Sequence, residues 1–374
     1  MLAGPISPNP REGDPVQLAE LVGFRPLPGA GLLVCLTRRC PLACAHCSTA
    51  SVATGPQPDG RVLARFVGSF TAEDRPEVMM LTGGEPLLRP RLAGELAELA
   101  RTAGTRTALL SGMFFVRDGG VPSRIMAAIT RMDHFSASLD VFHEREVARA
   151  DVLRALATVL DAGIPVSVHL TGSGPDDPYL ADATAEIRRA FGDRVPMLVN
   201  LVRPLGRAAA WAAAGTSSAT GAAPCAMAAW PTIAYDGTIV ACCNQHTVDR
   251  RPAPAHLTLG HLDDTDWPTV RRRTLASPAL RLIRGIGPVQ LHARYAPDTR
   301  ARQESGSGYC EDCHRLGEQP KTLAAAARAA SGQVGELLDR AIARRQADAG
   351  PAALVRRYGC ARYADLVTLT APGR

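Results

Sequence analysis

Three cysteines near the start of the chain are spaced closely enough to hold a metal centre. Cys40, Cys44 and Cys47 have the spacing C-x3-C-x2-C. Cysteine thiolates hold iron–sulfur clusters, and a [4Fe–4S] cluster normally takes four of them. Three thiolates on one loop would leave one iron without a protein ligand, and chemistry happens at an open metal position. Structural zinc sites usually pair two C-x2-C sequences, so the spacing favours iron–sulfur over zinc or buried thiols.

A second motif, Gly83-Gly84-Glu85-Pro86, closes the predicted strand Val78–Leu81. Two glycines at a strand end let another group approach the backbone closely. Glu85 offers an acceptor for an ammonium group, and Pro86 removes a backbone donor and ends the strand. Alone, such a tetrapeptide indicates a simple turn. Here the motif follows the three cysteines by one strand–helix unit, and in that position it indicates a binding site beside them.

Together these motifs make the chain resemble the radical S-adenosylmethionine (radical SAM) enzymes over about residues 30–207. His46 fills the aromatic position that this family has before the third cysteine. The resemblance implies that the open iron chelates the amino and carboxylate groups of S-adenosylmethionine (SAM). The reduced cluster would pass one electron to the sulfonium, and the resulting 5′-deoxyadenosyl radical would remove a hydrogen atom from the substrate. It also implies an electron donor such as flavodoxin or ferredoxin.

The same resemblance suggests which other positions bind SAM. Ser111 ends the third predicted strand, and Ser138 and Asp140 end the fourth, where family members often contact the ribose or methionine part. Pro204-Leu205-Gly206-Arg207 resembles a loop that closes over the adenine. Each of these segments would otherwise be an ordinary turn. The predicted cofactor-binding residues are therefore Gly83, Gly84, Glu85, Pro86, Ser111, Ser138 and Asp140.

Four later cysteines, Cys225, Cys242, Cys310 and Cys313, resemble an auxiliary-cluster domain of the SPASM type or its shortened "twitch" form. Cys242 lies five positions after a glycine, and Cys310 and Cys313 have the spacing C-x2-C. The pattern predicts one fully ligated auxiliary [4Fe–4S] cluster, because the further cysteines of a full SPASM domain are absent. Cys243 could replace Cys242 as a ligand, and a zinc knuckle split across a hairpin is the alternative.

The remaining cysteines and histidines carry weaker expectations. Cys360 is expected in a helix, either as a free or buried thiol or as a fourth ligand or hydrogen-atom donor, and it is the one weak catalytic candidate. Cys35 is expected to pack within a strand. His134 and His143 flank the fourth strand, and His143 could face the site, although such histidines are more often satisfied polar residues. No general base is identified.

The order of predicted elements indicates an α/β fold. Each predicted strand is followed by a helix, which is typical of a parallel sheet. Six such units are too few for a closed eight-stranded barrel, so we expect a partial (β/α)6 barrel with its site at the strand carboxyl ends. The six predicted strands are Leu32–Leu36, Val78–Leu81, Thr107–Leu110, Phe135–Leu139, Val166–Leu170 and Met197–Val202.

The expected domains follow from these elements and motifs. Residues 1–29 form an extension, 30–207 the radical SAM core, 208–318 a small auxiliary-cluster domain, and 319–374 a helical tail. Within the auxiliary domain we expect a hairpin with an Asp-Gly turn over Thr232–Ala241 and a helix over Trp267–Arg284. The tail is expected to be two helices, Thr322–Gln346 and Ala352–Thr368.

Composition excludes several classes of function. The chain has 374 residues, 46% of them hydrophobic, and a formal charge of +6 that comes almost entirely from arginine. No compact basic run with interleaved aromatics is present, which argues against nucleic-acid binding. No signal peptide or membrane span is evident, so we expect a cytoplasmic protein with no membrane partner. In that reducing location its ten cysteines are more readily metal ligands than disulfides.

Three functions remain from the sequence. The first is radical modification of a ribosomally made peptide in natural-product maturation. The second is a small-molecule dehydrogenase or epimerase acting on a sugar or aminocyclitol. The third, of another class, is a non-catalytic zinc or iron–sulfur binding protein. We place the first slightly ahead of the second.

Overall fold

One sheet of nine strands, in the order β6-β5-β4-β3-β2-β1-β7-β8-β9, runs through the structure. The structure is a computed structural model that describes residues 16–116, 120–212, 223–296 and 309–369. Residues 1–15 of the predicted extension lie outside the described residues. The first six strands are mutually parallel, which confirms the predicted α/β class. They are β1 (Gly31–Cys35), β2 (Val78–Thr82), β3 (Arg106–Ser111), β4 (His134–Leu139), β5 (Val166–Gly172) and β6 (Met197–Leu201).

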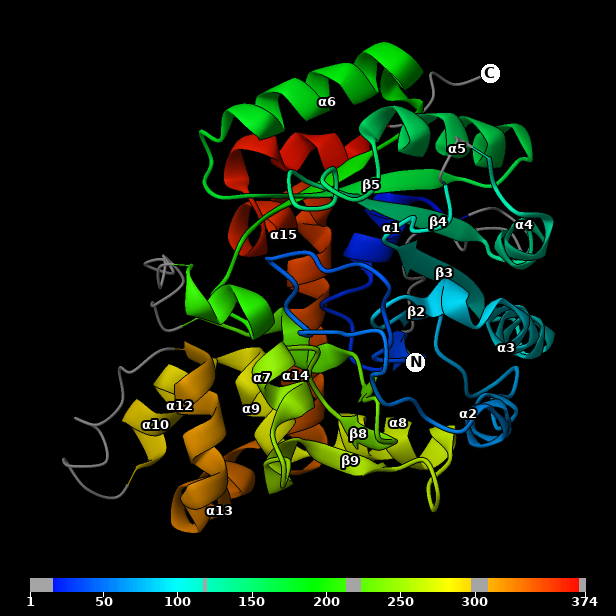
Figure 1. Cartoon of the computed structure of the whole chain (residues 1–374). Coiled ribbons are helices and arrows are strands. Elements are labelled where there is room, and N and C mark those ends of the chain that lie inside the picture. The colour runs from blue at the N-terminus through cyan, green and yellow to red at the C-terminus, as the bar shows by residue number, and fades with distance from the viewer. Residues whose placement is uncertain (1–15, 117–119, 213–222, 297–308, 370–374) are drawn as a thin grey trace.

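Five helices connect the parallel strands and cover the outer face of the sheet (Figure 1). Their apolar faces pack on the strands; α3, for example, buries Leu92, Leu96 and Ala100. Side-chain caps start two of them, because Asp59 accepts from the Arg61 N–H and Asp177 from the Tyr179 N–H. The five helices are α2 (Gly60–Val67), α3 (Pro90–Thr102), α4 (Ser123–Ile129), α5 (Arg149–Asp161) and α6 (Pro178–Phe191).

The sheet continues beyond β1 into the C-terminal half of the chain. β7 (Thr232–Ile233) pairs in parallel with β1, with Leu33 opposite Thr232. β8 (Thr238–Val240) and β9 (Thr258–His261) then extend the sheet in antiparallel fashion. The predicted hairpin is present, and Gly237 in its turn has φ of +91°, which glycine adopts without strain. The pairing places the later cysteines beside the barrel.

The remaining helices lie around the inner side of the sheet and below it (Figure 1). Leu18 of α1 packs with Val355 of α15 and with Val367, so the two ends of the described chain meet inside the curve of the sheet. The helices are α1 (Leu18–Gly23), α7 (Gln245–Asp249), α8 (Trp267–Ala276), α9 (Pro278–Gly285), α10 (Pro288–Tyr295), α12 (Tyr309–Arg315), α13 (Pro320–Ala330), α14 (Gly332–Asp348) and α15 (Gly350–Tyr358).

Three predicted helices were wrong in extent because local breakers divide them. The predicted helix 267–284 is α8 and α9, since the Ser277 side chain caps a new helix that starts at Pro278. The predicted helix 322–346 is α13 and α14, divided at Gly332, whose φ is +72°. The predicted helix 352–368 ends at Tyr358, and a 3₁₀ helix, Ala361–Thr368, follows it.

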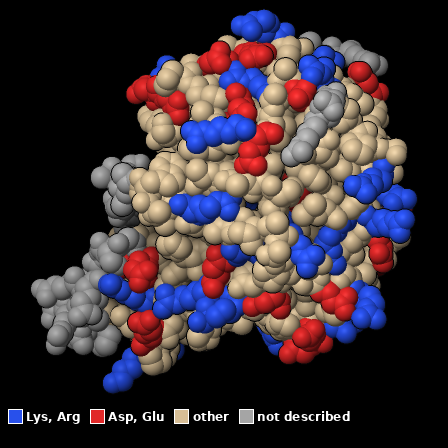
Figure 2. All heavy atoms as spheres, viewed as in Figure 1, with Lys and Arg blue, Asp and Glu red and all other residues tan. Residues whose placement is uncertain are grey.

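Charged side chains of both signs are interspersed over the face shown in Figure 2, and no extended region of one sign covers it. No helix among the described ranges combines the length and the apolar character that a membrane crossing requires.

Candidate active site

A cavity of about 650 Å³ inside the barrel brings the three predicted cluster cysteines together, since Cys40, Cys44 and Cys47 all line it. Side chains alternate between the two faces of a strand, and residues of β1, β2, β3, β5 and β6 point into this space. Examples are Leu33, Met80, His169, Thr171, Leu198 and Asn200. The cysteine loop follows β1 directly, so it lies at the strand carboxyl ends as expected.

Hydrogen bonds hold the cysteine loop in a tight conformation. The Cys47 N–H donates to the Cys44 carbonyl at 3.2 Å, and the Cys40 N–H donates to the Val52 carbonyl at 3.0 Å. The Cys47 sulfur lies 3.2 Å from the Thr49 hydroxyl. All three thiols are free of disulfides. Three free thiols on one cavity wall fit a three-cysteine cluster site.

The surroundings give these thiols different acidities. Burial raises the pKa of Cys40 to about 12. Burial alone would also raise the pKa of Cys47, but hydrogen bonds with Thr49 and Ser51 and the charge of Arg207 lower it. Cys47 is therefore the thiol that loses its proton more readily, and a metal needs the thiolate form.

Gly83 and Gly84 hold the segment that leads into the cysteine loop. The Gly84 N–H donates to the Thr37 carbonyl at 2.6 Å, and the Glu85 N–H donates to the Arg39 carbonyl at 2.8 Å. A Cβ atom on Gly83 would lie 2.3 Å from the Thr37 oxygen, and one on Gly84 would lie 2.4 Å from the Arg39 oxygen. Both positions require glycine, because the two backbones touch.

Glu85 is fully buried, and protein donors surround its carboxylate. It accepts from the Leu87 N–H at 2.9 Å, the Gly112 N–H at 2.9 Å and the Ser111 hydroxyl at 3.0 Å. Burial raises its pKa to about 7 despite these bonds. Glu85 does not line the cavity, whereas Gly83 and Gly112 do. The carboxylate thus ties β2 to β3, and its contact with a SAM ammonium group stays a prediction.

Most of the other predicted SAM-binding residues, like Glu85, do not line the cavity. None of Gly84, Pro86, Ser111, Ser138 and Asp140 is among the described residues that line the cavity. Pro86 starts a short 3₁₀ helix, Pro86–Leu88. The loop at 204–207, in contrast, does reach the cavity through Leu205 and Arg207.

Asp140 organises two histidines beside the cysteine loop. Its Oδ2 lies 3.1 Å from His46 Nε2 and 2.6 Å from His143 Nδ1. Burial alone would raise the pKa of Asp140, but these hydrogen bonds hold it well below its usual range. Burial would lower the pKa of His143, but hydrogen bonds with Asp140 and Cys44 raise it to about 10. His143 lines the cavity, so it faces the site as the sequence suggested.

Arg207 binds the cysteine loop through its backbone carbonyls. Its side chain donates to the Cys44 carbonyl at 2.8 Å and to the Ser51 carbonyl at 2.6 Å. A Cβ on Gly206 would lie 2.3 Å from the Cys47 oxygen. The loop predicted to cover the adenine therefore also fixes the shape of the cysteine loop.

The four predicted auxiliary cysteines lie near one another. Burial raises the pKa of Cys242 well above its usual value, and the neighbouring thiols of Cys243, Cys225 and Cys313 add to the rise. Burial likewise raises the pKa of Cys313, and the neighbouring thiols of Cys225 and Cys310 add to the rise.

Asn244, at the start of α7, contacts two of these sulfurs. Its N–H donates to Cys242 Sγ at 3.3 Å, and its side-chain amide to Cys310 Sγ at 3.5 Å. The four thiols fit the ligand set of one cluster. Cys243 differs from its neighbour Cys242, because it lines the barrel cavity.

Cys360 is not in a helix, which corrects the sequence-based expectation. It lies between α15 and the 3₁₀ helix Ala361–Thr368, because Gly359 interrupts the helix with φ of −112° and ψ of −143°. Its N–H donates to the Val199 carbonyl at 2.8 Å. It is 1% exposed within the main core and does not line the cavity.

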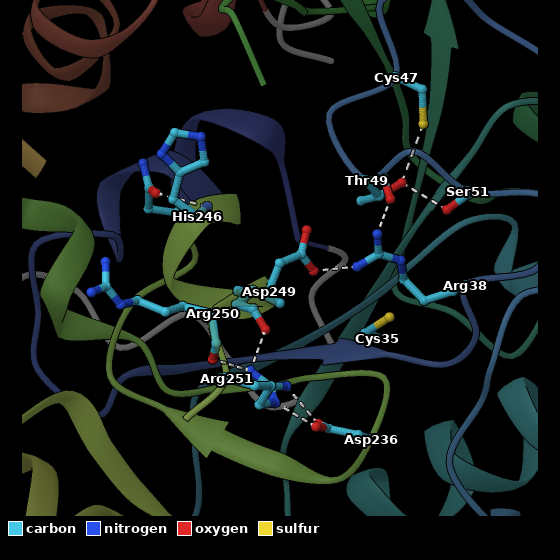
Figure 3. Close-up of polar contacts among 12 residues, drawn as sticks. Cys35, Arg38, Cys47, Thr49, Ser51, Asp236, His246, Asp249, Arg250 and Arg251 are labelled. Atoms are coloured by element: carbon cyan, nitrogen blue, oxygen red, sulfur yellow. Dashed lines mark hydrogen bonds and ion pairs between the residues drawn. The ribbon is translucent and has the colours of Figure 1, made fainter. Parts of the chain in front are cut away.

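A polar network links the cysteine loop to the C-terminal half, as Figure 3 shows. Arg38 donates to the Thr49 carbonyl and forms an ion pair with Asp249 of α7. Arg251 holds Asp236 in the β7–β8 turn through two hydrogen bonds of 2.5 and 2.6 Å. Arg38 and Arg251 both lie over the Tyr235 ring. The two halves of the molecule are therefore joined at the site.

Arg25, His169 and Thr232 are among the cavity residues that the sequence did not single out. Arg25 lies in the proline-rich region assigned only as an extension. His169 and Thr171 alternate with apolar residues along β5, and that alternation was the available signal. Thr232 reaches the cavity only because β7 pairs with β1.

Comparisons with known proteins bear on this site. No curated protein matches the chain. Among solved structures, SuiB of Streptococcus suis, crystallised with the precursor peptide SuiA, is similar with a TM-score of 0.47 and 10% sequence identity. The match covers 66% of this chain and 65% of that chain, so this chain spans slightly less than two thirds of SuiB.

The family match covers the part of the chain that carries the cysteine loop. Residues 34–216 match the radical SAM superfamily. That span includes Cys40, Cys44, Cys47 and the Gly83–Pro86 motif, and the family implies a [4Fe–4S] cluster and SAM. The chain therefore carries, over residues 34–216, a domain that matches the radical SAM superfamily.

Proposed function

We propose that the chain is a radical SAM enzyme whose cluster is held by Cys40, Cys44 and Cys47 and whose substrate occupies the barrel cavity. The observation that carries this is the convergence of three free thiols on one cavity wall. When bound, such a cluster supplies the electron that cleaves SAM to methionine and a 5′-deoxyadenosyl radical. Gly83 and Gly112 leave backbone groups facing the cavity beside the thiols, where a small polar ligand can approach.

The protein's own residues keep the cysteine loop ordered. Arg207 and the glycine pair hold the cysteine loop between them. The rings of His46 and Phe142 stack at 4.8 Å over the loop, and Trp211 donates to the Ala45 carbonyl at 3.1 Å. These contacts cover part of the loop and so limit the access of water to reactive species formed beneath it.

We further propose one auxiliary [4Fe–4S] cluster bound by Cys225, Cys242, Cys310 and Cys313. Cys310 and Cys313 both lie in α12, one turn apart, and so present both sulfurs to the same side. Full ligation by protein thiolates suits electron transfer better than substrate binding, because no iron is left open.

Anaerobic reconstitution with iron and sulfide, followed by a 5′-deoxyadenosine assay with SAM and dithionite, tests the first proposal. The wild type should form 5′-deoxyadenosine, and Cys40→Ala with Cys44→Ala and Cys47→Ala should not. The control is Cys360→Ala, which should keep the iron of the first cluster. Wild-type protein that binds zinc in preference to iron, and cleaves no SAM, would make the chain a non-catalytic metal protein.

Iron counting tests the auxiliary cluster. Two clusters predict about eight irons per chain, and one predicts about four. Cys310→Ala with Cys313→Ala should lose about half of the iron and keep the EPR signal of the first cluster. Retention of all the iron by the double variant would rule out this ligand set.

The cavity favours a small metabolite as substrate over a precursor peptide. The cavity volume of about 650 Å³ lies within the usual range for small-molecule sites, about 300–1,000 Å³, and the substrate must share that space with the cluster and SAM. Both α1 and α15 contribute to its lining, so the space left beside SAM suits a small molecule better than a long peptide segment. A precursor peptide that accelerates 5′-deoxyadenosine formation, where sugars and amino acids do not, would reverse this order.

A further inference from the structure

The described lining of the barrel cavity is strongly biased in charge. It includes four arginines, Arg25, Arg38, Arg203 and Arg207, and no aspartate or glutamate. Arg38 has Asp249 as its ion-pair partner. The other three have no carboxylate within ion-pair distance among the residues that the structure describes. Positive charge enclosed in a cavity favours an anionic ligand.

Among these four arginines, Arg25 alone donates no hydrogen bond to an oxygen atom of the described residues. Arg203 donates to the Tyr358 carbonyl, and Arg207 to two carbonyls of the cysteine loop. Arg25 instead donates from one nitrogen to two sulfurs, Met227 Sδ at 3.4 Å and Cys243 Sγ at 3.1 Å. Sulfur is a weak acceptor, and a guanidinium carries five N–H donors. Its fork is therefore largely free for an oxyanion.

The position of Arg25 is well defined. Its guanidinium lies over the Trp230 ring, 4.4 Å from the centroid, and the indole N–H donates to the Phe24 carbonyl at 2.9 Å. Stacking on an aromatic face orients the guanidinium. A preordered fork binds a planar carboxylate with little loss of side-chain freedom.

An apolar surface adjoins this charge. Leu18, Leu21 and Val22 follow the i, i+3, i+4 spacing of one face of α1. Arg25 lies in the turn that follows this helix, and all four residues line the cavity. Leu354 and Val355 of α15 line it as well. The cavity-lining face of α1 is thus aliphatic, and the turn at its C-terminal end carries the cationic Arg25.

Two buried polar atoms in the same cavity have no partner among the described residues. Thr232 is 2% exposed, and its Oγ1 makes no hydrogen bond. His169 Nε2 is buried and also unpaired. Both residues line the cavity. Buried polar groups are normally satisfied, so each atom is available to a polar group of a ligand in the cavity.

We infer that the substrate is a small amphipathic carboxylic acid, with its carboxylate on Arg25, its apolar body along α1 and α15, and its polar groups on Thr232 and His169. The inference rests on the proposed function, because it assigns the substrate of the same cavity. A carboxylate is favoured over a phosphate, because one guanidinium matches one negative charge and the adjoining walls are aliphatic.

Isothermal titration of the reconstituted, SAM-loaded protein tests the inference with 4-methylpentanoate, the neutral 4-methylpentanamide and inorganic phosphate. We expect the acid to bind at least about tenfold more tightly than the amide, and phosphate to bind no better than the amide. Arg25→Gln should abolish the preference for the acid, and Arg25→Lys should restore part of it. The control is Arg124→Gln, because Arg124 is exposed and does not line the cavity.

Several outcomes would overturn the inference. They are equal binding of acid and amide by the wild type, binding of neither, tighter binding of phosphate, or an unchanged preference in Arg25→Gln. Iron loss from Arg25→Gln with the preference kept would assign Arg25 to the thiols instead. Wild-type data alone decide the matter if the variant does not fold. A wild type that prefers the acid but forms no 5′-deoxyadenosine would refute the proposed function and not this inference.

Discussion

Arg38 and Asp249 form an ion pair although 211 positions separate them in the chain. Arg38 follows β1 and also donates to the Thr49 carbonyl in the cysteine loop. Asp249 ends α7, the helix that begins directly after the Cys242-Cys243 pair. One five-residue helix therefore connects the auxiliary cysteines before its start to the first cysteine loop at its end. Figure 3 shows the contact of Asp249 with Arg38.

Asp249→Asn should loosen the cysteine loop. Arg38 is 14% exposed and Asp249 36%, so the pair is partly screened and its loss should cost about 1 kcal/mol of unfolding free energy. Iron should leave the first cluster faster when a chelator is added, because Thr49 contacts the Cys47 sulfur. The control is Asp193→Asn, which removes an exposed pair with Arg188. Equal iron release by the two variants would contradict the link.

Gly83→Ala should disturb the site more than its small size suggests. Gly83 has φ of +141°, and its new Cβ would meet the Thr37 oxygen at 2.3 Å. Strain of this kind costs about 1–3 kcal/mol, and the displaced backbone carries the cysteine loop. We expect reduced iron binding and a lower melting temperature. Gly174→Ala, where nothing lies within 4 Å of the new Cβ, should show neither effect.

Asp339→Asn should strongly destabilise the C-terminal half. Asp339 accepts from Arg284 Nε at 2.9 Å and Nη2 at 2.6 Å, and both side chains are buried. Removing one partner leaves a buried charge unpaired, at a cost of about 3–5 kcal/mol. Chemical denaturation measures the change. Asp365→Asn, which removes an exposed pair with Arg356, should change the unfolding free energy by less than about 1 kcal/mol.

Stability should fall as the solution is made acidic, in part through His134. Burial lowers its pKa to about 4, although the Val16 carbonyl opposes the shift. The unfolded chain, with a histidine pKa near 6.5, binds a proton that the folded chain does not. The stabilising contribution is thus present above about pH 6.5 and is lost as the pH falls toward 4.

Melting curves between pH 7.5 and 5.5 check this expectation. His134→Gln should be less stable at pH 7.5, because it disturbs the hydrogen bonds to Val16 and Ser167, but its stability should depend less on pH. The same substitution at His246, which is exposed, should leave the wild-type slope. A His134→Gln slope equal to that of the wild type would show that His134 does not contribute.

Much of the fold could be predicted because its signals are local. The six parallel strands are short apolar runs, each followed by a helix, and the predicted ranges agree closely with the observed strands. The helix extents were less predictable, because a single residue such as Ser277 or Gly332 divides a run whose composition is helical throughout.

The cysteine motifs could also be predicted, because the ligand spacing lies within one loop or one helical turn. The direction in which each side chain points could not be predicted from the spacing. Cys242 and Cys243 are adjacent, yet only Cys243 lines the barrel cavity. For Cys360 the sequence left open a free or buried thiol and a ligand or hydrogen-atom donor, and the structure encloses it in the core. Burial depends on what packs against a residue, and those neighbours come from distant segments.

The sequence by itself determined the order of strands and helices, the cysteine loop and its glycine-rich companion, because these depend on residues close together in the chain. Only the tertiary structure decided the pairing of β7 with β1, the contact of Arg38 with Asp249, and the place of Arg25 in the cavity wall. Each of these joins segments about 200 residues apart, and contacts at that separation arise only when the whole chain packs.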